Sequence, residues 1–435
     1  MIVDNIRAVL FKGLDFLKGN SIGSHYKKLK YLMEKADYNQ LLEFQSASLT
    51  RLLQHAQETT MYYYAANFEK ITDFPVVNKK IITDNKEAFL SSSFKGDLLH
   101  SVSTSGSTGT PFTIYQDKRK TDCHKVDTIY FNELSGLNLG NRLFYFRVWD
   151  KLVKKSTATF FVQNILPLDA SKLDCEHFES TFFQELKNET TKVCLLAYAS
   201  TFEALSKCIA NKQRGISKVK SIITMSETLP EGSRALLENY FSCPVVSRYS
   251  NMENGMIGIQ IKEVNNYYLL NEVSFIIEVL QFDTDKTVED GEMGRIVITD
   301  LFNFSQPLIR YDTGDIGSVV FELFKGKKRK FLKKIEGRKV DFISSTTGLL
   351  VSPHTITNTM WRYQFIKQFQ FIQLEQNTYK LILNMDLVHQ NKLTELISDL
   401  KNYLGEDAIL STEFTDEIPL LNSGKRKKIV NLYQV

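Results

Sequence analysis

Apolar residues recur at helical spacing in the amino-terminal part of the chain. Between Tyr38 and Phe68 they are Leu41, Leu42, Phe44, Leu49, Leu52 and Leu53. This spacing predicts a helical region that packs on the outside of a sheet. An earlier group of apolar residues lies near the amino terminus: Val9, Leu10, Phe11, Leu14, Phe16 and Leu17. We expect this group to form an amphipathic helix that docks on the main body, with contact to a membrane surface as the alternative.

The middle of the chain alternates between two kinds of apolar segment. Short apolar runs occupy Leu143–Trp149, Val193–Ala199, Ile222–Met225 and Val245–Val246. Longer amphipathic segments lie between or after them, for example Thr201–Ala210 and Ser233–Phe241. Strands that alternate with helices in this way predict an α/β core.

The pattern changes after Asn266 to closely spaced strands broken by Asp-rich and Gly-containing turns. These strands are expected at Tyr267–Leu280, Arg295–Thr299 and Gly317–Phe321. They predict a β-rich subdomain. The strongly basic run from Lys325 to Lys334 is interpreted as a solvated hairpin turn, rather than as a phosphate-binding segment.

The carboxyl-terminal part reads as a compact unit of its own. It is expected to contain a hairpin of Phe369–Leu374 and Tyr379–Met385, a helix over Asn391–Leu404 and a strand near Ile409–Phe414. A segment of about a hundred residues is within the usual size range of a domain. We therefore divide the chain into a large body (1–336), a hinge (337–341) and a small α+β domain (342–435).

Composition and charge narrow the class of protein. Apolar residues make up 43% of the 435 residues and charged residues 24%, which predicts a folded globular chain. The net charge of +4 does not favour a dedicated nucleic-acid binder. No stretch approaches the roughly 18 apolar residues of a membrane-spanning helix. The scattered cysteines are expected to be reduced thiols in the cytoplasm: Cys123, Cys175, Cys194, Cys208 and Cys243.

The segment Ser103–Pro111 is a hydroxyl-rich loop punctuated by two glycines and set between two short apolar strands. Glycines let the backbone approach a polyphosphate, and Ser and Thr hydroxyls with backbone amides supply donors to its oxygens. The loop lacks the Gly-Lys-Ser/Thr ending of a Walker loop. Taken alone, a loop of this composition is more often a flexible surface connector, so its context has to decide.

Further motifs follow this loop in a fixed order. They are Ser226–Pro230, Tyr249–Gly255, Arg310–Asp315, Gly337-Arg338 with Asp341, and Asn422–Lys425. Together with the Ser103–Pro111 loop they resemble the ordered motifs of the adenylate-forming ligases, with Arg310–Asp315 as the most specific match. From roughly Tyr38 to Val430 the chain most resembles the phenylacetate–CoA ligase branch, including its capsular-polysaccharide-associated relatives.

The resemblance implies a large multi-layer α/β body with a β-rich subdomain and a small, mobile α+β domain. It also implies a reaction in which a carboxylic acid and ATP, with Mg²⁺, give an acyl-AMP and pyrophosphate. The acyl group would then pass to coenzyme A. Two alternatives remain: transfer to an amine on a sugar or other acceptor, and a non-catalytic nucleotide-binding scaffold.

The resemblance also implies roles for individual residues. The phosphate-binding residues would be Ser103, Thr104, Ser105, Gly106, Ser107, Thr108, Gly109 and Thr110. The adenine would lie against Ser226, Glu227, Thr228, Tyr249 and Ser250. Asp315 would bind the ribose, and Arg338 would bind ribose or phosphate oxygens. Glu253 would hold Mg²⁺, and Lys425 would be the catalytic cation at the carboxylate and α-phosphate.

Each role has a structural alternative. Asp315 is a common turn residue after glycine, Arg338 could belong to a surface ion pair, and Glu253 could cap the following segment. Tyr249 could be a buried core tyrosine, and Lys425 belongs to a basic cluster of the kind that faces solvent. The acid itself is not readable from the sequence; Trp149 and Gly255–Gly258 are the candidates for its pocket.

Two departures from the family pattern bear on the hinge and on the acceptor. The second residue after Arg338 is Val340 instead of the usual acidic residue, which comes one position later as Asp341. The loop Ser344–Gly348 lacks a basic residue before its glycine, which weakens the case for coenzyme A.

Overall fold

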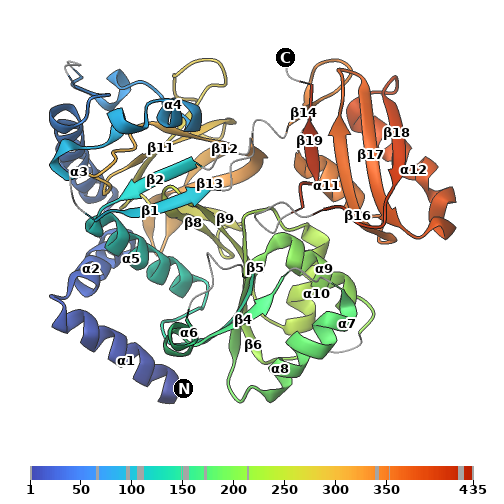
Figure 1. Cartoon of the computed structure of the whole chain (residues 1–435), viewed down its shortest axis with the longest axis horizontal. Helices are drawn as coiled ribbons and strands as arrows, with labels where there is room; N and C mark the ends of the chain where they lie inside the picture. Colours follow the sequence, from blue (N-terminus) through green and yellow to red (C-terminus); the bar gives the residue numbers. More distant parts are fainter. Residues whose placement is uncertain are drawn as a thin grey trace.

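The computed structural model describes residues 2–64, 68–94, 98–104, 112–147, 149, 156–170, 174–212, 215–338, 342–351, 353–419 and 426–433. Most of the chain forms a large body around an eleven-stranded sheet, and the carboxyl-terminal part forms a separate four-stranded unit beside it (Figure 1). The strands of the large sheet follow the order β10-β11-β12-β13-β9-β8-β7-β6-β5-β3-β4.

One half of the large sheet is parallel and covered on both faces. Its strands are β3 (Arg142–Arg147), β4 (Ile165–Asp169), β5 (Val193–Tyr198), β6 (Val219–Met225) and β7 (Val245–Asn251). Alternate residues of β5 point to opposite faces. Leu195 packs with α9 (Ala199–Ile209) and α10 (Glu231–Phe241), while Leu196 packs with α2 (Ser21–Glu34) and α5 (Lys118–Leu134). These strands and helices confirm the predicted α/β class.

The other half of the large sheet is antiparallel. Its strands are β8 (Gly255–Ile261), β9 (Tyr267–Leu270), β10 (Phe275–Leu280), β11 (Gly294–Asp300), β12 (Tyr311–Phe324) and β13 (Lys327–Arg338). The single strand predicted at Tyr267–Leu280 is therefore wrong. The side chain of Asn271 accepts from the Ser274 amide at 3.2 Å and donates to the Met256 carbonyl at 3.2 Å, which turns the chain between β9 and β10.

The basic run after Phe324 is a hairpin turn, as predicted. Lys325 and Gly326 both have positive φ angles, 50° and 76°, and join β12 to β13. The run is not solvated throughout, however, because Arg329 is fully buried. Its guanidinium donates to the carbonyls of Leu32 and Ala36 at 2.6 and 2.7 Å. It thereby satisfies the Leu32 carbonyl, which the end of α2 leaves without a helical partner, and the Ala36 carbonyl just beyond the helix.

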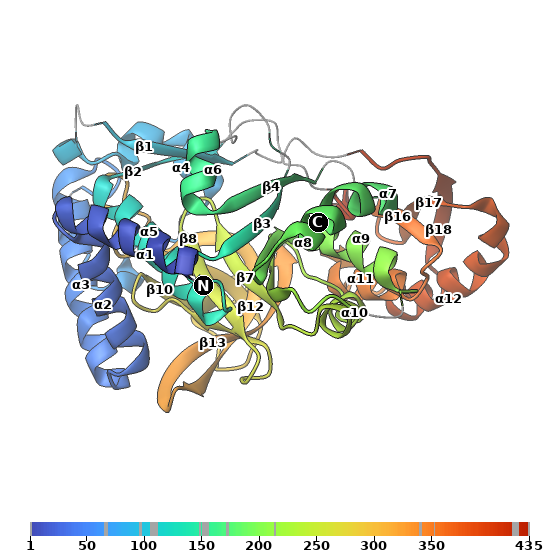
Figure 2. The same cartoon turned by 90° about the horizontal axis from the view of Figure 1, so that it is seen from below.

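The helices of residues 2–59 lie together on one side of the body (Figure 2). The predicted helix between Tyr38 and Phe68 is α3 (Tyr38–Thr59), whose start is closed by the side chains of Asp37 and Gln40. The predicted first helix is α1 (Ile2–Leu17). Its docking on the main body is not confirmed for the predicted apolar residues, because Val9, Leu14 and Leu17 are more than half exposed.

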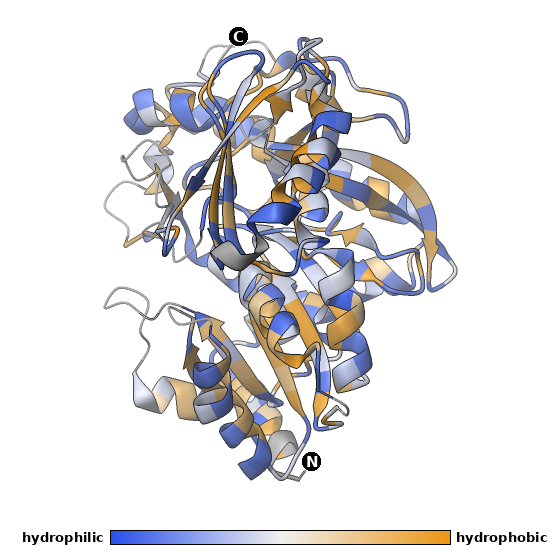
Figure 3. Cartoon of the chain, turned by 90° about the vertical axis from the view of Figure 1, so that its right-hand side faces the viewer, coloured by the Kyte–Doolittle hydropathy of each residue, from blue (hydrophilic) through white to orange (hydrophobic). Residues whose placement is uncertain are grey.

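The carboxyl-terminal unit has its own core. It contains α11 (Pro353–Trp361), β16 (Ile366–Gln373), β17 (Thr378–Met385), α12 (Leu393–Leu404), β18 (Ile409–Phe414) and β19 (Ile429–Asn431). The strands follow the order β18-β17-β16-β19, and their inward residues pack on Leu396 and Leu400 of α12. The hydropathy colouring of Figure 3 follows this arrangement, with hydrophobic residues along the strands and both kinds of residue on the helices.

The described chain also contains short strands and α-helices, besides four 3-10 turns at Ile71–Asp73, Lys86–Phe89, Ser92–Phe94 and Leu387–Lys392. The short strands and α-helices are β1 (His100–Thr104), β2 (Phe112–Gln116), β14 (Ile343–Ser344), β15 (Leu350–Val351), α4 (Lys79–Asp84), α6 (Thr157–Gln163), α7 (Cys175–His177) and α8 (Gln184–Asn188). A π-helical turn, Phe178–Phe183, joins α7 to α8. Among the described residues, none of these helices or the longer ones has both the length and the apolar surface to cross a membrane.

Two of the five cysteines differ from the prediction that all are reduced thiols. Cys175 of α7 and Cys208 of α9 form a disulfide, so the expectation of five reduced thiols is wrong for these two. They are separated by 33 residues, but the fold brings their Cα atoms to 5.3 Å. Cys123, Cys194 and Cys243 are buried and lie outside this disulfide, as expected of reduced structural thiols.

Candidate active site

The hydroxyl-rich loop connects two paired strands. β1 and β2 are antiparallel, with Thr104 opposite Phe112, so they hold both ends of the loop. The Ser103 hydroxyl shares a hydrogen bond with the Thr113 hydroxyl at 2.8 Å. Ser105, Gly106, Ser107, Thr108, Gly109 and Thr110, with the side chain of Thr104, lie outside the described residues. Their phosphate-binding roles stay predictions.

Tyr249 lies in β7, where the two halves of the large sheet join, and its side chain meets that of Asp315 from β12. The Tyr249 hydroxyl donates to Oδ2 of Asp315 at 2.7 Å. The ring is 7% exposed and packs among apolar side chains such as Ile257 and Phe275. Burial raises the pKa of Tyr249 well above its usual value, and the Asp315 carboxylate raises it further. The hydroxyl therefore stays protonated and remains a donor to the carboxylate.

A second cluster surrounds Glu253, which is 2% exposed. Its Oε1 accepts a hydrogen bond from the Tyr311 hydroxyl at 3.0 Å and lies 2.7 Å from Nζ of Lys79. Phe112, the first residue of β2, stacks on Tyr311 at 6.3 Å between ring centroids, and Lys79 lies 5.5 Å from the Phe112 ring. The cluster thus joins Glu253 to the base of the hydroxyl-rich loop.

Local contacts fix the backbone of two motif segments, Tyr249–Gly255 and Arg310–Asp315. In the first, the Asn251 side chain accepts from the Asn254 amide at 2.7 Å, and the Asn254 carbonyl accepts from buried Lys120 at 2.7 Å. In the second, Arg310 has a positive φ of 49° and its guanidinium pairs with Glu278 at 3.1 Å. A residue other than glycine rarely adopts such a φ, so the surrounding contacts hold Arg310 in place.

The remaining sequence-predicted residues are distributed around these clusters. Ser226 follows β6 with a positive φ of 72°, and it is exposed, as is Thr228. Glu227 accepts from the Ser200 amide at 3.3 Å. Asp315 lies opposite Arg338 in the pairing of β12 with β13. Ser250 pairs with Met256 across β7 and β8.

Not all of the predicted residues belong to the described part of the chain. The side chain of Arg338, the whole of Lys425 and most of the expected hinge (339–341) lie outside the described residues. The structure brings together Tyr249, Asp315 and Glu253 with the strands that hold the loop. The roles of these residues toward nucleotide and metal stay predictions.

Two residues of the cluster around Glu253 were not expected from the sequence. Tyr311 lies inside the Arg310–Asp315 motif, but the motif itself gave no reason to pair it with Glu253. Lys79 belongs to the helix start at Asn78, far from both in sequence. Its position follows from the backbone, because Val77 donates to the Arg310 carbonyl at 3.0 Å and accepts from the Asp312 amide at 2.7 Å.

The candidates for an acid pocket have identifiable contacts. Gly255 has a φ of +97°, and a Cβ at this position would lie 2.0 Å from Nδ1 of His124. Only glycine fits this approach. Burial lowers the pKa of His124 to about 4, with Lys120 adding to the effect, so this imidazole is neutral. Trp149 is half-buried and donates to the Leu168 carbonyl at 3.0 Å.

The carboxyl-terminal unit contacts the helices that cover the parallel strands. Trp361 donates to the Ser233 hydroxyl at 2.8 Å, and its ring lies so close to Gly232 that a Cβ there would clash. Lys207 of α9 donates to the Ile366 carbonyl at 2.9 Å. Glu203 of the same helix pairs with Lys428, the last residue of the basic cluster that begins at Lys425.

Comparison with known proteins identifies similar sequences and structures. A family model of the CapK C-terminal domain matches residues 343–432. Protein CapK of Staphylococcus aureus is 22% identical over 443 residues, which cover 97% of this chain and 96% of CapK. A 2-hydroxyisobutyryl-CoA ligase solved in the postadenylation state with R3-HIB-AMP has a TM-score of 0.70 at 15% identity, with 92% of this chain and 91% of the ligase covered.

The same ligase, solved with 2-HIB-AMP and CoA in the thioesterification state, has a TM-score of 0.58 at 15% identity. That match covers 93% of this chain and 92% of the ligase. These similarities confirm the predicted acyl-CoA-synthetase-like fold and the resemblance from which it was predicted. The whole-chain arrangement is more similar to the postadenylation state than to the thioesterification state.

Proposed function

We propose that this protein activates a carboxylic acid with ATP, forming an acyl-AMP and releasing pyrophosphate, and then transfers the acyl group to coenzyme A. The observation that carries the proposal is the pairing of Tyr249 with Asp315 beside the Glu253 cluster. These groups come from two motifs that are distant in sequence, Tyr249–Gly255 and Arg310–Asp315. Their convergence at the base of the hydroxyl-rich loop supports one shared nucleotide site.

In this proposal Asp315 binds the ribose. An ionised carboxylate accepts two hydroxyl hydrogen bonds, each worth about 1.5–3 kcal/mol. The hydroxyl of Tyr249 orients the carboxylate from the side of the core. The hydroxyls and amides of the loop close over the phosphates, and Lys425 supplies a positive charge at the α-phosphate while the carboxylate oxygen attacks phosphorus.

Magnesium enters as part of the substrate Mg·ATP, and Glu253 fits as its protein ligand. Mg²⁺ is bound in such sites by one or two carboxylates together with phosphate oxygens and water. Among the described residues there is no cluster of three His, Cys, Asp or Glu side chains that would hold a metal by itself. A single carboxylate, held on one oxygen by Tyr311 and Lys79, suits a metal that arrives with the nucleotide.

The acceptor has a second candidate. The described turn after β14 carries Ser345, Thr346, Thr347 and Gly348, without the basic residue that would favour coenzyme A. An amine acceptor therefore remains the alternative for the second half-reaction. It leaves the first half-reaction, which the clustered motifs support, unchanged.

The first half-reaction is tested by pyrophosphate exchange. We expect the purified protein with Mg·ATP to exchange labelled pyrophosphate into ATP only when a suitable acid is present. A panel of aryl, fatty and amino acids identifies the substrate class, and coenzyme A or amines added afterwards identify the acceptor. ATP binding without exchange for any acid in the panel would favour the non-catalytic scaffold instead.

The ribose contact is tested by ATP affinity. We expect Tyr249→Phe to weaken ATP binding about tenfold, because it removes one hydrogen bond to a charged group and about 1.4 kcal/mol corresponds to a factor of ten. Asp315→Ala should weaken it at least as much. Titration calorimetry with Mg·ATP measures both. Tyr268→Phe, in the same apolar cluster, is the packing control and should leave the affinity unchanged. An unchanged affinity in folded Asp315→Ala protein would remove the ribose role.

A further inference from the structure

The first helix presents its apolar side to solvent. Six large apolar residues of α1 are between 51% and 81% exposed: Ile6, Val9, Leu10, Leu14, Phe16 and Leu17. At 100° per residue these positions span an arc of about 160° on one side of the helix. In a helix that docks on a globular body, the apolar arc faces the core. Here it faces outward.

The opposite side of α1 holds the helix on the body. Phe11 is half-buried and Asp15 is 9% exposed. The Asp15 carboxylate accepts from the backbone amides of Ile22 and Gly23 at 3.1 and 2.7 Å, at the start of α2. This contact uses the acidic group on the inner side of the helix and fixes the apolar arc away from the protein.

A second exposed apolar patch continues the arc. Phe161 and Val162 of α6 are 72% and 66% exposed. The guanidinium of Arg7 lies 5.4 Å from the Phe161 ring centroid, so α6 lies beside α1. Two elements distant in sequence therefore expose large apolar side chains at one place on the surface.

Positive charge surrounds this apolar surface. Arg7 and Lys12 lie on the flanks of the arc by helical spacing, and Lys18 directly follows the last residue of α1. Residues 1–35 contain seven basic and three acidic residues, a net charge of +4, which equals the net charge of the whole chain. The remaining 400 residues are therefore balanced in charge. Residues 1–18, which contain α1, carry +1 of the surplus, and residues 19–35, which contain α2, carry +3.

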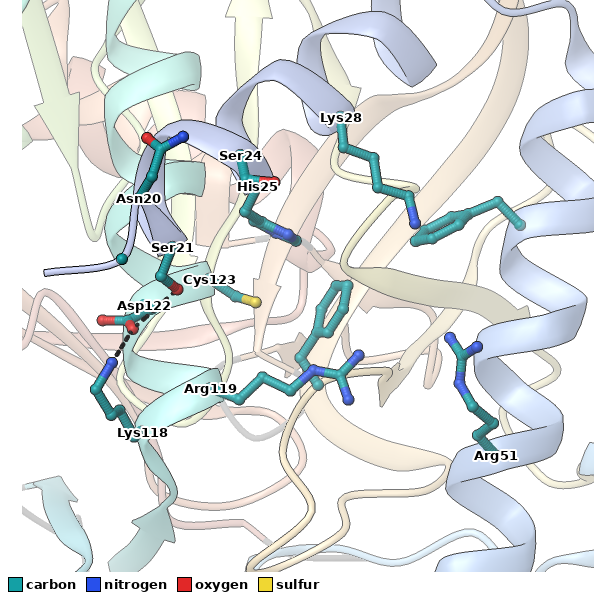
Figure 4. Close-up of a pocket in the computed structure, with 13 residues that line it drawn as sticks. Asn20, Ser21, Ser24, His25, Lys28, Arg51, Lys118, Arg119, Asp122 and Cys123 are labelled. Atoms are coloured by element: carbon teal, nitrogen blue, oxygen red, sulfur yellow. Dashed lines mark hydrogen bonds and ion pairs between the residues drawn. The ribbon is translucent and has the colours of Figure 1, made fainter. Parts of the chain in front are cut away.

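A cavity of about 540 Å³ at the end of α1 is lined by further basic side chains. It begins at Gly19 and Asn20, and Lys28, Arg51 and Arg119 line it from three helices (Figure 4). None of these three cations pairs with a carboxylate of a described residue; their contacts are with aromatic rings and with Ser48. Asp122 also lines the cavity, but Lys118 and Lys125 pair with it.

We propose that α1, together with Phe161 and Val162 of α6, binds the surface of a membrane rich in anionic phospholipid. The apolar arc enters the boundary between headgroups and acyl chains, and the flanking basic side chains meet lipid phosphates. A second copy of this chain fits less well, because two copies packed through this surface would bring one basic rim against another. The inference does not depend on the proposed enzymatic activity.

The test is co-sedimentation of the full-length protein with vesicles. We expect binding to vesicles of phosphatidylcholine with about one third phosphatidylglycerol, weak binding to phosphatidylcholine alone, and release at 0.5 M salt because screening weakens the electrostatic part. Leu10→Glu with Leu17→Glu should reduce binding at least tenfold. Lys12→Gln with Lys18→Gln should reduce the preference for anionic vesicles several-fold.

A matched control carries the same chemical change elsewhere. Leu323 and Ile409 are 66% and 60% exposed, and Leu323→Glu with Ile409→Glu should leave vesicle binding unchanged. Unchanged thermal unfolding of both double variants shows that the fold is kept. The proposal is overturned if the wild type does not bind anionic vesicles, or if both double Glu variants bind equally. It is also overturned if Leu10→Glu with Leu17→Glu instead converts a dimer, measured by light scattering, into a monomer.

Discussion

Replacing Lys425 by alanine should slow acyl-adenylate formation roughly a hundredfold or more and leave acyl transfer almost unchanged. Removing one preorganised charge stabiliser from a reaction site costs about 2.7–4 kcal/mol of transition-state stabilisation. The charge is needed only while the carboxylate oxygen attacks the α-phosphate. The second half-reaction breaks the acyl–phosphate bond after pyrophosphate has left, so a lysine at that position has no comparable role in it.

The measurement separates the two half-reactions. Pyrophosphate exchange measures adenylate formation. Consumption of synthetic acyl-AMP, supplied with coenzyme A or an amine, measures acyl transfer alone. Lys427→Ala, which removes the same charge from the same basic cluster, is the control and should retain both activities. Equal losses in both half-reactions of Lys425→Ala would contradict the assignment, and equal effects of the two lysines would favour a solvated cluster without a catalytic role.

The neighbouring contacts connect this prediction to domain movement. Lys428 is three residues beyond Lys425, and burial disfavours its charge, yet the nearby Glu203 carboxylate gives it a raised pKa. The pair ties the carboxyl-terminal unit to α9 on the large body. If the unit rotates about residues 337–341 between the half-reactions, as the family resemblance implies, this pair has to separate each time.

The parallel half of the fold was predictable because its strands are buried on both faces. Val193–Tyr198 is a continuous apolar run in which every residue is buried, and such runs followed by amphipathic segments predict βα units. The carboxyl-terminal unit was predictable for a related reason. Residues of β17 alternate between buried and half-buried positions, and this period of two marks a strand with one covered face.

The helix α5 was missed for a physical reason that its sequence contains. Its inward positions include Cys123, Val126, Tyr130 and Phe131, which follow helical spacing. Lys120 and Asp127 occupy the same inward side and are fully buried. Charged residues at core positions break the apolar pattern on which the prediction relies. A sequence pattern cannot reveal that a distant carboxylate or hydroxyl will satisfy them.

The site was predictable as a set of motifs but not as a set of contacts. The sequence placed Tyr249, Glu253 and Asp315 in two ordered matches to a family pattern. Their partners depend on tertiary packing: Lys79 reaches Glu253 only because Val77 pairs with the strand that begins at Tyr311. A hydroxyl that orients a carboxylate and a lysine that pairs with a buried glutamate have no signature in a single sequence.

Replacing Lys120 by methionine should lower the free energy of unfolding by about 3–5 kcal/mol. Lys120 and Asp300 are both fully buried, and the lysine ammonium pairs with Oδ2 of Asp300. No other described donor is bonded to that oxygen. Removing one partner of a buried ion pair leaves the other charge buried without compensation, which is far more costly than losing a surface pair.

We expect Lys120→Met to affect the candidate active site as well. The Lys120 ammonium also donates to the Asn254 carbonyl, next to Glu253, and lies 4.9 Å from the ring of Phe275 in β10. Methionine fills the volume of the lysine stem but leaves this carbonyl without its donor. We therefore expect weaker Mg·ATP binding in addition to the loss of stability, since Glu253 loses part of the support for its backbone.

Denaturant unfolding followed by circular dichroism measures the loss, with two variants as controls. Lys118→Met removes a lysine from the same helix whose side chain is 84% exposed and pairs with Asp122, so it should change stability by less than about 1 kcal/mol. If Lys120→Met alone fails to fold, its combination with Asp300→Asn keeps the test open. Asparagine removes the unpaired charge and can still accept from the Phe302 amide through its oxygen. The double variant should be more stable than the single one, and a Lys120→Met protein as stable as Lys118→Met would show that the buried pair does not support this part of the fold.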